Sequence, residues 1–515
     1  MNKLIFLVLI IGIIYRLILT SDGNFIFNMD NARDMVDVRE VVVLGKMRLI
    51  GPTSAIDGFY NGPAWYYLLA IPFILSGGNP YASILMEIVL WAIGAYFLFK
   101  LVSKWSLPAT FFVLTVWVTS NLVLLSTAYA FNPNPVMLLT PLLIYLMAKF
   151  IETKKIVYSL STFTLAALFF HFEMNAGVFL LPVIVLTVIL SKNINLLKTK
   201  IFILGLLTYF LLLSPQIIFD IKHDFIMAKS VISYLSSAAY MGQVTSPIER
   251  VPLMYETFYD AILPTFANFK QFVDIFIALF ISLVVMVLFK FIGLLKSDNK
   301  KDLVLIISLL IIFVPFLSFI FISVGVSRWH LGAVVAAAVL MGGYILNQLS
   351  ELSKWGKILA FGLMGTYLIF SVINVKNYLT DSRKPSNDPA VFANELAAVD
   401  FVYKKADGKS FKVYSYLPSV IDYPYQYLIW WRGLDKYGYT PEDYAYAPNK
   451  PPYIAQKERL ETGEQRDSSG LIYLIKQPDE TGRRHLWENT FKHLELLSTE
   501  KVGPLIIEIR KEEIL

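Results

Sequence analysis

The sequence contains no cysteine, and only 16% of its 515 residues are charged. The absence of cysteine excludes disulfides and thiol–metal sites. The shortage of charge argues against a soluble protein of this length, because such a chain needs far more polar surface to cover its core. The sequence also shows no internal repeat and no low-complexity linker.

Long apolar runs are present instead, since 56% of the residues are hydrophobic and the mean hydropathy is +0.58. Runs of this kind can cross the ~30 Å hydrocarbon core of a bilayer. We therefore predict a mainly α-helical, polytopic membrane protein with about eleven spans. The expected spans lie near residues 4–20, 81–99, 107–127, 134–149, 156–171, 174–190, 201–219, 272–294, 303–323, 331–349 and 357–375. The first run looks like a signal peptide but lacks a small-residue cleavage site, so we expect an uncleaved first helix.

Lysine clusters occupy alternate connections between these runs. They are Lys100 and Lys104; Lys149, Lys154 and Lys155; Lys192, Lys198 and Lys200; Lys296, Lys300 and Lys301; Lys354 and Lys357. By the positive-inside rule these connections are cytoplasmic, which predicts a multi-pass protein of the cell (inner) membrane with a cytoplasmic N-terminus. The net charge of +6 then reflects topology, and we expect no nucleic-acid partner.

Two domains are expected: a transmembrane module over residues 1–378, whose first outer loop is 21–80, and an extracytoplasmic α/β domain over residues 379–515. Within the first loop, residues 63–76 are apolar but too short to span, which indicates an interfacial helix or, alternatively, an extra tilted span. In the C-terminal domain we predict helices at 388–405 and 483–497 and strands at 412–417, 471–476 and 505–510. An aromatic cluster at 422–432 fits a packed core better than a sugar-stacking surface.

The first outer loop places Asp30, Asp34 and Asp37 on one helical face, with Arg33 beside them. Carboxylates in this arrangement could act as a general base or bind a cation, although a solvated juxtamembrane helix would look the same. Further polar or aromatic residues fall at the outer ends of spans: Asn61, Trp65, Tyr66, Tyr67, Asn132, Asn134, His171, Glu173, Arg328 and His330. They could bind substrate or lipid phosphate, or simply cap helices. Arg16, one turn inside the first span, either snorkels or pairs with a lipid phosphate.

At these residues the sequence resembles the GT-C superfamily of multi-spanning glycosyltransferases. It looks closest to the bacterial branch of the dolichyl-phosphate-mannose–protein mannosyltransferase family, which includes aminoarabinose transferases. The resemblance covers roughly residues 1–375. It rests on the acidic loop at Asp30, on Gly62-Pro63 followed by aromatics, on Phe131-Asn132-Pro133, and on the stretch Ser214 to His223.

The resemblance implies transfer of a hexosyl or pentosyl group, with inversion, from a polyprenyl-phosphate-linked donor to an extracytoplasmic lipid, glycan or protein. Asp30 matches the family's catalytic base. Cationic side chains would stabilise the departing phosphate, and the candidates are Arg16, Arg33, His330 and Arg328. The aromatics Trp65, Tyr66 and Tyr67 would line the polyprenyl or sugar groove.

Two departures from the family pattern restrict these expectations. Many relatives carry a second acidic residue in the next outer loop, where this chain has only Asn132 and Asn134. This departure weakens the case for a metal-dependent mechanism, but a divalent cation stays an alternative as a cofactor. Aminoarabinose transferases place a lysine where this chain has Asn61, which argues against that particular substrate. A transporter or lipid-linked sugar flippase, and a polysaccharide ligase or polymerase, are the competing functions.

Overall fold

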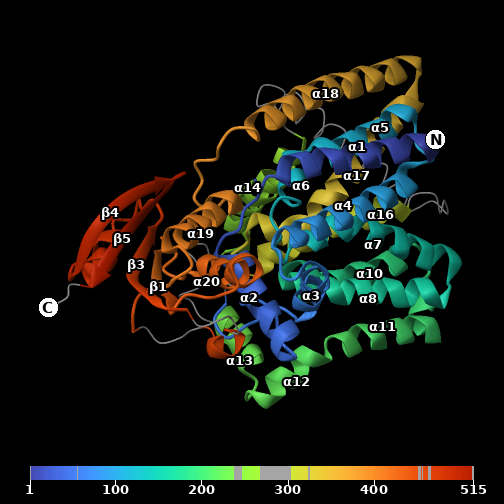
Figure 1. The fold of residues 1–515 in the computed structure, drawn as a ribbon. Helices are drawn as coiled ribbons and strands as arrows, with labels where there is room; N and C mark the ends of the chain where they lie inside the picture. The colour runs from blue at the N-terminus through green and yellow to red at the C-terminus, as the bar shows by residue number, and fades with distance from the viewer. Residues whose placement is uncertain are drawn as a thin grey trace.

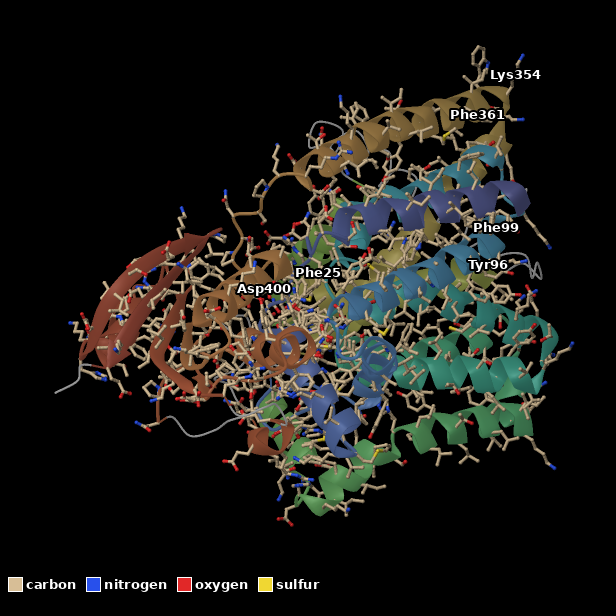
Figure 2. The ribbon with its side chains drawn as sticks, viewed as in Figure 1. Phe25, Tyr96, Phe99, Lys354, Phe361 and Asp400 are labelled. Atoms are coloured by element: carbon tan, nitrogen blue, oxygen red, sulfur yellow. The ribbon has the colours of Figure 1, made fainter. Side chains whose placement is uncertain are left out.

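The computed structural model describes residues 2–54, 56–236, 246–266, 303–322, 325–449, 454, 456–461 and 466–512. The chain forms a bundle of long helices with a small sheet domain at one end (Figure 1). The N-terminus lies at the opposite end of the bundle. Lys354, from one of the lysine-rich connections, is labelled at that same far end in Figure 2. The predicted span at 272–294 lies outside the described residues.

The bundle contains most of the helices that the hydropathy pattern predicts. They are α1 (Asn2–Thr20), α4 (Tyr81–Val102), α5 (Leu107–Thr119), α6 (Asn121–Leu125), α7 (Asn134–Thr153), α8 (Ile156–Phe172), α9 (Met174–Gly177), α10 (Leu180–Leu190), α11 (Lys200–Leu212), α12 (Ser214–Lys222), α16 (Leu303–Phe321), α17 (Gly332–Leu352) and α18 (Lys354–Asp381). Helices α2 (Met29–Leu44) and α3 (Ala64–Ser76) form the first loop, and α13 (Ile226–Ser236) and α14 (Pro247–Phe266) follow α12.

Five helices of the described chain are long and apolar enough to cross a membrane, or six if α11 and α12 form one bent span. The five are α4, α7, α16, α18 and the continuous segment Arg328–Leu352. Five shorter apolar helices accompany them: Phe6–Thr20, Ala64–Ser76, Leu107–Thr119, Ile156–Phe172 and Met174–Leu190. The structure thus confirms a polytopic helical bundle, while the number of spans stays a prediction.

Several predicted spans are interrupted in the structure. The segment 107–127 breaks at Ser120, whose backbone is extended (ψ 129°). The segment 201–219 bends by 46° between α11 and α12. Pro215 lies in the first turn of α12, where its missing N–H removes a hydrogen bond that would otherwise continue the helix. The residue pattern predicted the apolar length of these segments and missed the local breaks.

The helices approach closely where small residues meet a neighbouring backbone. A Cβ added to Gly94 in α4 would lie 2.0 Å from the carbonyl oxygen of Leu138 in α7. The Trp117 indole lies next to this contact, with one ring carbon 3.1 Å from the same Cβ position, and Trp91 Nε1 donates to Trp117 O at 3.0 Å. The bundle is therefore held by tight packing, as expected where lipid removes most of the hydrophobic driving force between helices.

The C-terminal domain is a five-stranded sheet with helices on both faces. Its elements are α19 (Phe392–Ala406), β1 (Ser410–Tyr416), α20 (Tyr423–Arg432), β2 (Asp443–Ala445), β3 (Ser468–Lys476), α21 (Arg484–Glu488), β4 (Leu494–Val502) and β5 (Leu505–Glu512). The strand order is β2-β1-β3-β5-β4, with β1 parallel to β2 and β3 and the other pairs antiparallel. Helices α19 and α20 lie between the sheet and the bundle (Figure 1).

The three predicted strands and the first predicted helix of this domain are confirmed, whereas the helix predicted at 483–497 is confirmed only in its first part. Helix α21 and the 3-10 turn Asn489–Phe491 are helical, but Leu494 begins strand β4. This strand pairs antiparallel with β5 from Leu494 opposite Glu512 to Val502 opposite Leu505. The unpaired edge of β5 thus decides the conformation of a segment whose local pattern also fits a helix.

The domain is docked onto the loop that follows α1. Phe27 N donates to Ala390 O at 2.8 Å, and Phe392 N donates to Phe25 O at 2.9 Å. The Phe25 ring stacks on Phe392 with centroids 4.7 Å apart, at the junction visible in Figure 2. Asp400, also labelled there, accepts two 2.9 Å hydrogen bonds from Arg432 and so ties α19 to α20.

The aromatic cluster at 422–432 belongs mostly to the core of this domain. Tyr425 and Tyr427 are fully buried, and Trp430 and Trp431 are nearly so. Tyr427 donates from its hydroxyl to Gly78 O at 2.5 Å, which adds a contact to the transmembrane module. Tyr423, at the start of α20, is partly exposed and faces the first loop.

Candidate functional site

Helix α2 carries the acidic face that the sequence predicts. Asn28 caps its N-terminus, where the Asn28 side chain accepts from Asp30 N at 3.0 Å, and Asp30 occupies the favourable first turn. Gly45 ends the helix in the left-handed conformation (φ 66°), which a glycine adopts without steric cost. The helix therefore places Asp30, Asp34 and Asp37 in one row, in which Asp34 and Asp37 contact α3.

Asp34 is the buried centre of this row, with 1% of its side chain exposed. It accepts hydrogen bonds from Arg33 at 3.0 and 2.9 Å, and Trp65 Nε1 donates to its other oxygen at 2.7 Å. Burial raises the pKa of Asp34 to about 6, because the charge of Arg33 and the hydrogen bond from Trp65 offset only part of the desolvation. Asp34 is thus a covered carboxylate that fixes α2 against α3.

Asp30 is the open member of the row, with 33% of its side chain exposed. Arg33 bridges the two acids, because its Nη1 donates to Asp30 at 3.1 Å while its other nitrogens bind Asp34. The bridge holds the Asp30 carboxylate in a defined orientation and leaves part of it accessible. Of the two acids, Asp30 is the one that a substrate can reach.

The row continues into a second set of ion pairs. Asp37 accepts from Tyr66 at 2.7 Å and from Arg48 at 2.6 Å, and Glu40 accepts from Arg48 and Lys46, each at 3.1 Å. Burial raises the pKa of Asp37, while Arg48 opposes this shift. We call the two sets together the charged ridge. Its members are Asp30, Arg33, Asp34, Asp37, Glu40, Lys46 and Arg48.

A pocket of about 820 Å³ opens beside the Asp30 end of the ridge. Its walls come from α1, α6, α7, α17 and α18 and are mostly apolar, as at Leu125 and Val335. Its polar lining includes Asn28, Tyr129, Asn134, Arg328 and Lys384. We call it the outer pocket.

Tyr129 links the outer pocket to Asp30. Asn28 Nδ2 donates to the Tyr129 hydroxyl at 3.2 Å, so the residue that caps α2 also forms part of the pocket wall. Burial raises the pKa of Tyr129, and the negative charge of Asp30 adds to the shift. Asp30 is not itself a lining residue, but it lies two residues after Asn28, which is one. The lining includes an acid as well as cations, because Lys384 donates to Asp381 at 2.7 Å.

Asn61, His171 and Glu173 meet at a different place, the seam between α3 and α8. Gly62 N donates to His171 O at 3.0 Å, and His171 Nε2 lies 2.9 Å from Leu212 O. Asn61 accepts from Met174 N at 3.3 Å. Glu173 caps α9 by accepting from both nitrogens of Asn175 at 3.1 Å. All three predicted residues are buried here and contact protein groups.

Asn132 and Asn134, at the connection between α6 and α7, hold the backbone of nearby segments. Asn132 Nδ2 donates to Phe172 O at 2.6 Å. Asn134 donates to Ser126 O at 3.1 Å and to Tyr129 O, and it also lines the outer pocket. Of these two asparagines, Asn134 is the one that lines the same cavity as Asn28.

The predicted cations fall in separate places. Arg16 is fully buried inside the bundle, where it stacks on Trp91 at 3.8 Å and donates to backbone carbonyls that include Val118 O. Arg328 lines the outer pocket and pairs with Asp260 at 3.5 Å. His330 accepts from Ser327 N at 3.0 Å and caps the turn Arg328–Leu331.

The predicted aromatics of α3 contact the ridge. Trp65 and Tyr66 donate to Asp34 and Asp37, and both are buried. Tyr67 donates from its hydroxyl to Arg48 O at 2.8 Å. Their polar atoms thus orient charged groups of the ridge.

Sequence reasoning missed Lys384, Tyr129, Lys46 and Arg48. The sequence does carry a signal for Lys46 and Arg48, because basic residues in a loop that is predicted to be outside run against the positive-inside rule. Lys384 follows the last helix of the bundle, and its approach to the pocket depends on the tertiary fold. Within the part of the chain that the structure describes, no group of three His, Asp or Glu side chains could hold a metal ion.

Comparisons with known proteins agree with this arrangement. Residues 61–219 match the family model described as dolichyl-phosphate-mannose-protein mannosyltransferase. Two crystal structures of ArnT from Cupriavidus metallidurans, one bound to undecaprenyl phosphate and one in the apo state, align with this chain at a TM-score of 0.60 and 9% identity. Each alignment covers 99% of this chain and 98% of ArnT. A search of curated proteins found no match.

The resemblance expected from the sequence is therefore confirmed. The likeness to ArnT shows a shared fold over the whole length, including the small sheet domain. The family match adds a sequence pattern over the segment that runs from Asn61 through α12. Together these findings show that the chain has the fold of ArnT over its length and that residues 61–219 share the sequence pattern of the dolichyl-phosphate-mannose-protein mannosyltransferase family model.

Proposed function

We propose that the chain is a glycosyltransferase that moves a hexosyl or pentosyl group from a polyprenyl-phosphate-linked donor to a hydroxyl of an extracytoplasmic acceptor. The observation that carries this proposal is the position of Asp30. Its oriented, partly exposed carboxylate lies close to Asn28 and Tyr129, two lining residues of the 820 Å³ outer pocket. The lining is mostly apolar and includes the ion-paired cations Arg328 and Lys384. An isoprenoid chain needs apolar walls, and its phosphate needs cations.

The transfer is a single displacement. Asp30 accepts the proton of the acceptor hydroxyl as its oxygen forms a bond to the anomeric carbon, and the bond from that carbon to the phosphate oxygen breaks. One displacement from the opposite face inverts the anomeric centre. The polyprenyl phosphate departs with the bonding electrons, and Arg328 and Lys384 would stabilise its added charge.

The lipid enters from the bilayer side of the outer pocket. Helices α1, α7, α17 and α18 contribute the walls, and polar lining residues such as Asn28 and Lys384 belong to the segments that lead into α2 and into the C-terminal domain. ArnT, which shares this fold, has been crystallised with undecaprenyl phosphate, and this supports a lipid phosphate as the leaving group here. In this proposal the lysine-rich end of the bundle is cytoplasmic and the site faces outward.

The decisive experiment replaces Asp30 by Asn and follows transfer from radiolabelled undecaprenyl-phosphate sugars in proteoliposomes that contain envelope extract as acceptor. Loss of a general base should slow transfer by about 10²–10⁴-fold. Asp22→Asn is the matched control, because Asp22 is an exposed acid in the same loop. Undiminished transfer by Asp30→Asn would overturn the proposal, as would movement of the labelled lipid between leaflets without any glycosidic product.

A further inference from the structure

A second pocket lies at the other end of the charged ridge, where α2 meets the C-terminal domain. Its volume is about 420 Å³, within the roughly 300–1,000 Å³ range of small-ligand sites. Asp37, Glu40, Lys46 and Arg48 line it, and Tyr423 from α20 forms part of its wall. We call it the ridge pocket. The proposed chemistry at Asp30 does not use it.

The charged groups of the ridge pocket are held in place by the surrounding structure. Arg48 donates to Asp37 and Glu40, and its main chain is fixed by Tyr67, whose hydroxyl accepts from Arg48 N at 3.0 Å. Asp37 and Arg48 keep 24% and 30% of their side chains exposed. The Nε atom of Arg48 is buried and has no hydrogen-bond partner among the described residues. The site is therefore pre-organised and still accessible.

The charge of the ridge pocket selects the class of ligand. Two carboxylates, Asp37 and Glu40, face two cations, Lys46 and Arg48, so their net charge is zero. An excess of positive charge would favour an anion, and an excess of negative charge would favour a divalent cation. Alternating strong donors and acceptors next to an aromatic ring suit a neutral molecule with many hydroxyl groups.

The ridge pocket and Asp30 share one face of α2. Seven residues separate Asp30 from Asp37, which corresponds to about 10 Å along the helix axis. Tyr423 lies within electrostatic range of both Asp37 and Arg33, so the C-terminal domain borders the path between the two ends. A ligand that contacts both ends must be longer than one monosaccharide.

We propose that the ridge pocket binds a neutral sugar unit of the acceptor, and hence that the acceptor is an oligosaccharide or glycan chain. This inference rests on the proposed function, because it treats Asp30 as the point of transfer. The pocket anchors one unit between Tyr423 and the ion pairs of Asp37 and Glu40, while a neighbouring unit presents its hydroxyl to Asp30.

The test uses the full-length protein in nanodiscs, fluorescently labelled and applied to an array of neutral di- to hexasaccharides of glucose, mannose, galactose, rhamnose and N-acetylglucosamine. Tyr423→Ala should weaken binding about tenfold, whereas Tyr423→Phe, which keeps the ring, should retain it. Lys46→Ala should also weaken binding. Its matched control is Lys149→Ala, which removes a similar ion pair with Glu152 in a lysine-rich connection.

Parallel calorimetry with inorganic phosphate and with magnesium chloride tests the other ligand classes. The inference is overturned if no neutral glycan binds, if binding ignores both Tyr423→Ala and Lys46→Ala, or if phosphate or magnesium binds in a Lys46-dependent way. The thermal unfolding of each variant separates a binding defect from misfolding. Transfer that depends on Asp30 without any glycan binding would overturn this inference alone, whereas transfer indifferent to Asp30→Asn would overturn the proposed function.

Discussion

Glu173 is a buried acid whose titration should affect stability. Burial raises its pKa to about 7, although two hydrogen bonds from Asn175 offset part of the shift. Because the folded state then holds the proton more tightly than the unfolded state, this contribution to stability is complete below about pH 4.5 and is lost as the pH rises through 7. The difference amounts to at most about 3 kcal/mol.

We expect the wild-type unfolding temperature to fall between pH 5 and pH 8, and Glu173→Gln to remove part of that fall. Glutamine keeps an oxygen acceptor for Asn175 without the ionisation. Differential scanning fluorimetry in detergent measures both curves. Glu152→Gln, an exposed acid of a lysine-rich connection, is the control. Parallel curves for the wild type and Glu173→Gln would contradict this account.

At the scale of single residues, the sequence predicted which side chains share a helix face, but it did not predict their hydrogen-bond partners. The spacing of Asp30, Asp34 and Asp37 follows from helical geometry alone. The hydrogen bond from Trp65 to Asp34 depends on how α2 and α3 are placed side by side, which no local pattern encodes. For the same reason the carbonyl partner of Arg16 at Val118, about a hundred residues away in sequence, could not be predicted.

At the scale of elements, local sequence patterns predict secondary structure well where the surroundings are uniform. They fail where a neighbouring element determines the conformation. Lipid favours long apolar helices, so α4, α7 and α18 follow from hydropathy. Residues 494–497 were misassigned to a helix because the free edge of β5 supplies hydrogen bonds that a helix-like pattern does not reveal. The break at Ser120 likewise has no strong signal in the sequence.

Gly94 should be the most sensitive glycine of the α4–α7 contact. Its Cβ position lies 2.0 Å from Leu138 O, so Gly94→Ala must separate two packed helices. Gly365 in α18 has no neighbouring atom within 4 Å of its Cβ position, and Gly365→Ala should be neutral or slightly stabilising. Fluorescence-detected size-exclusion chromatography after a heating series would compare them. Equal survival of both variants would show that α4 and α7 do not pack in this way.

At the scale of the whole molecule, the first loop and the C-terminal domain act as one unit. Arg39 of α2 is buried against Trp430, with its guanidinium 4.7 Å from the ring centroid. The loop after α1 pairs with residues 390–393 through backbone hydrogen bonds. The C-terminal domain therefore helps to hold α2, and with it Asp30 and both pockets, although it contributes no candidate base.

The orientation of this unit can be tested directly, because the chain has no cysteine and any introduced thiol is unique. We expect Glu480→Cys, in the exposed turn before α21, to react with a membrane-impermeant maleimide in intact spheroplasts. Lys198→Cys, in the connection between α10 and α11, should react only after permeabilisation, since its lysine cluster predicts a cytoplasmic loop. Reaction of the Lys198→Cys protein in intact spheroplasts would reverse the topology. It would place Asp30 on the cytoplasmic side and exclude an extracytoplasmic acceptor.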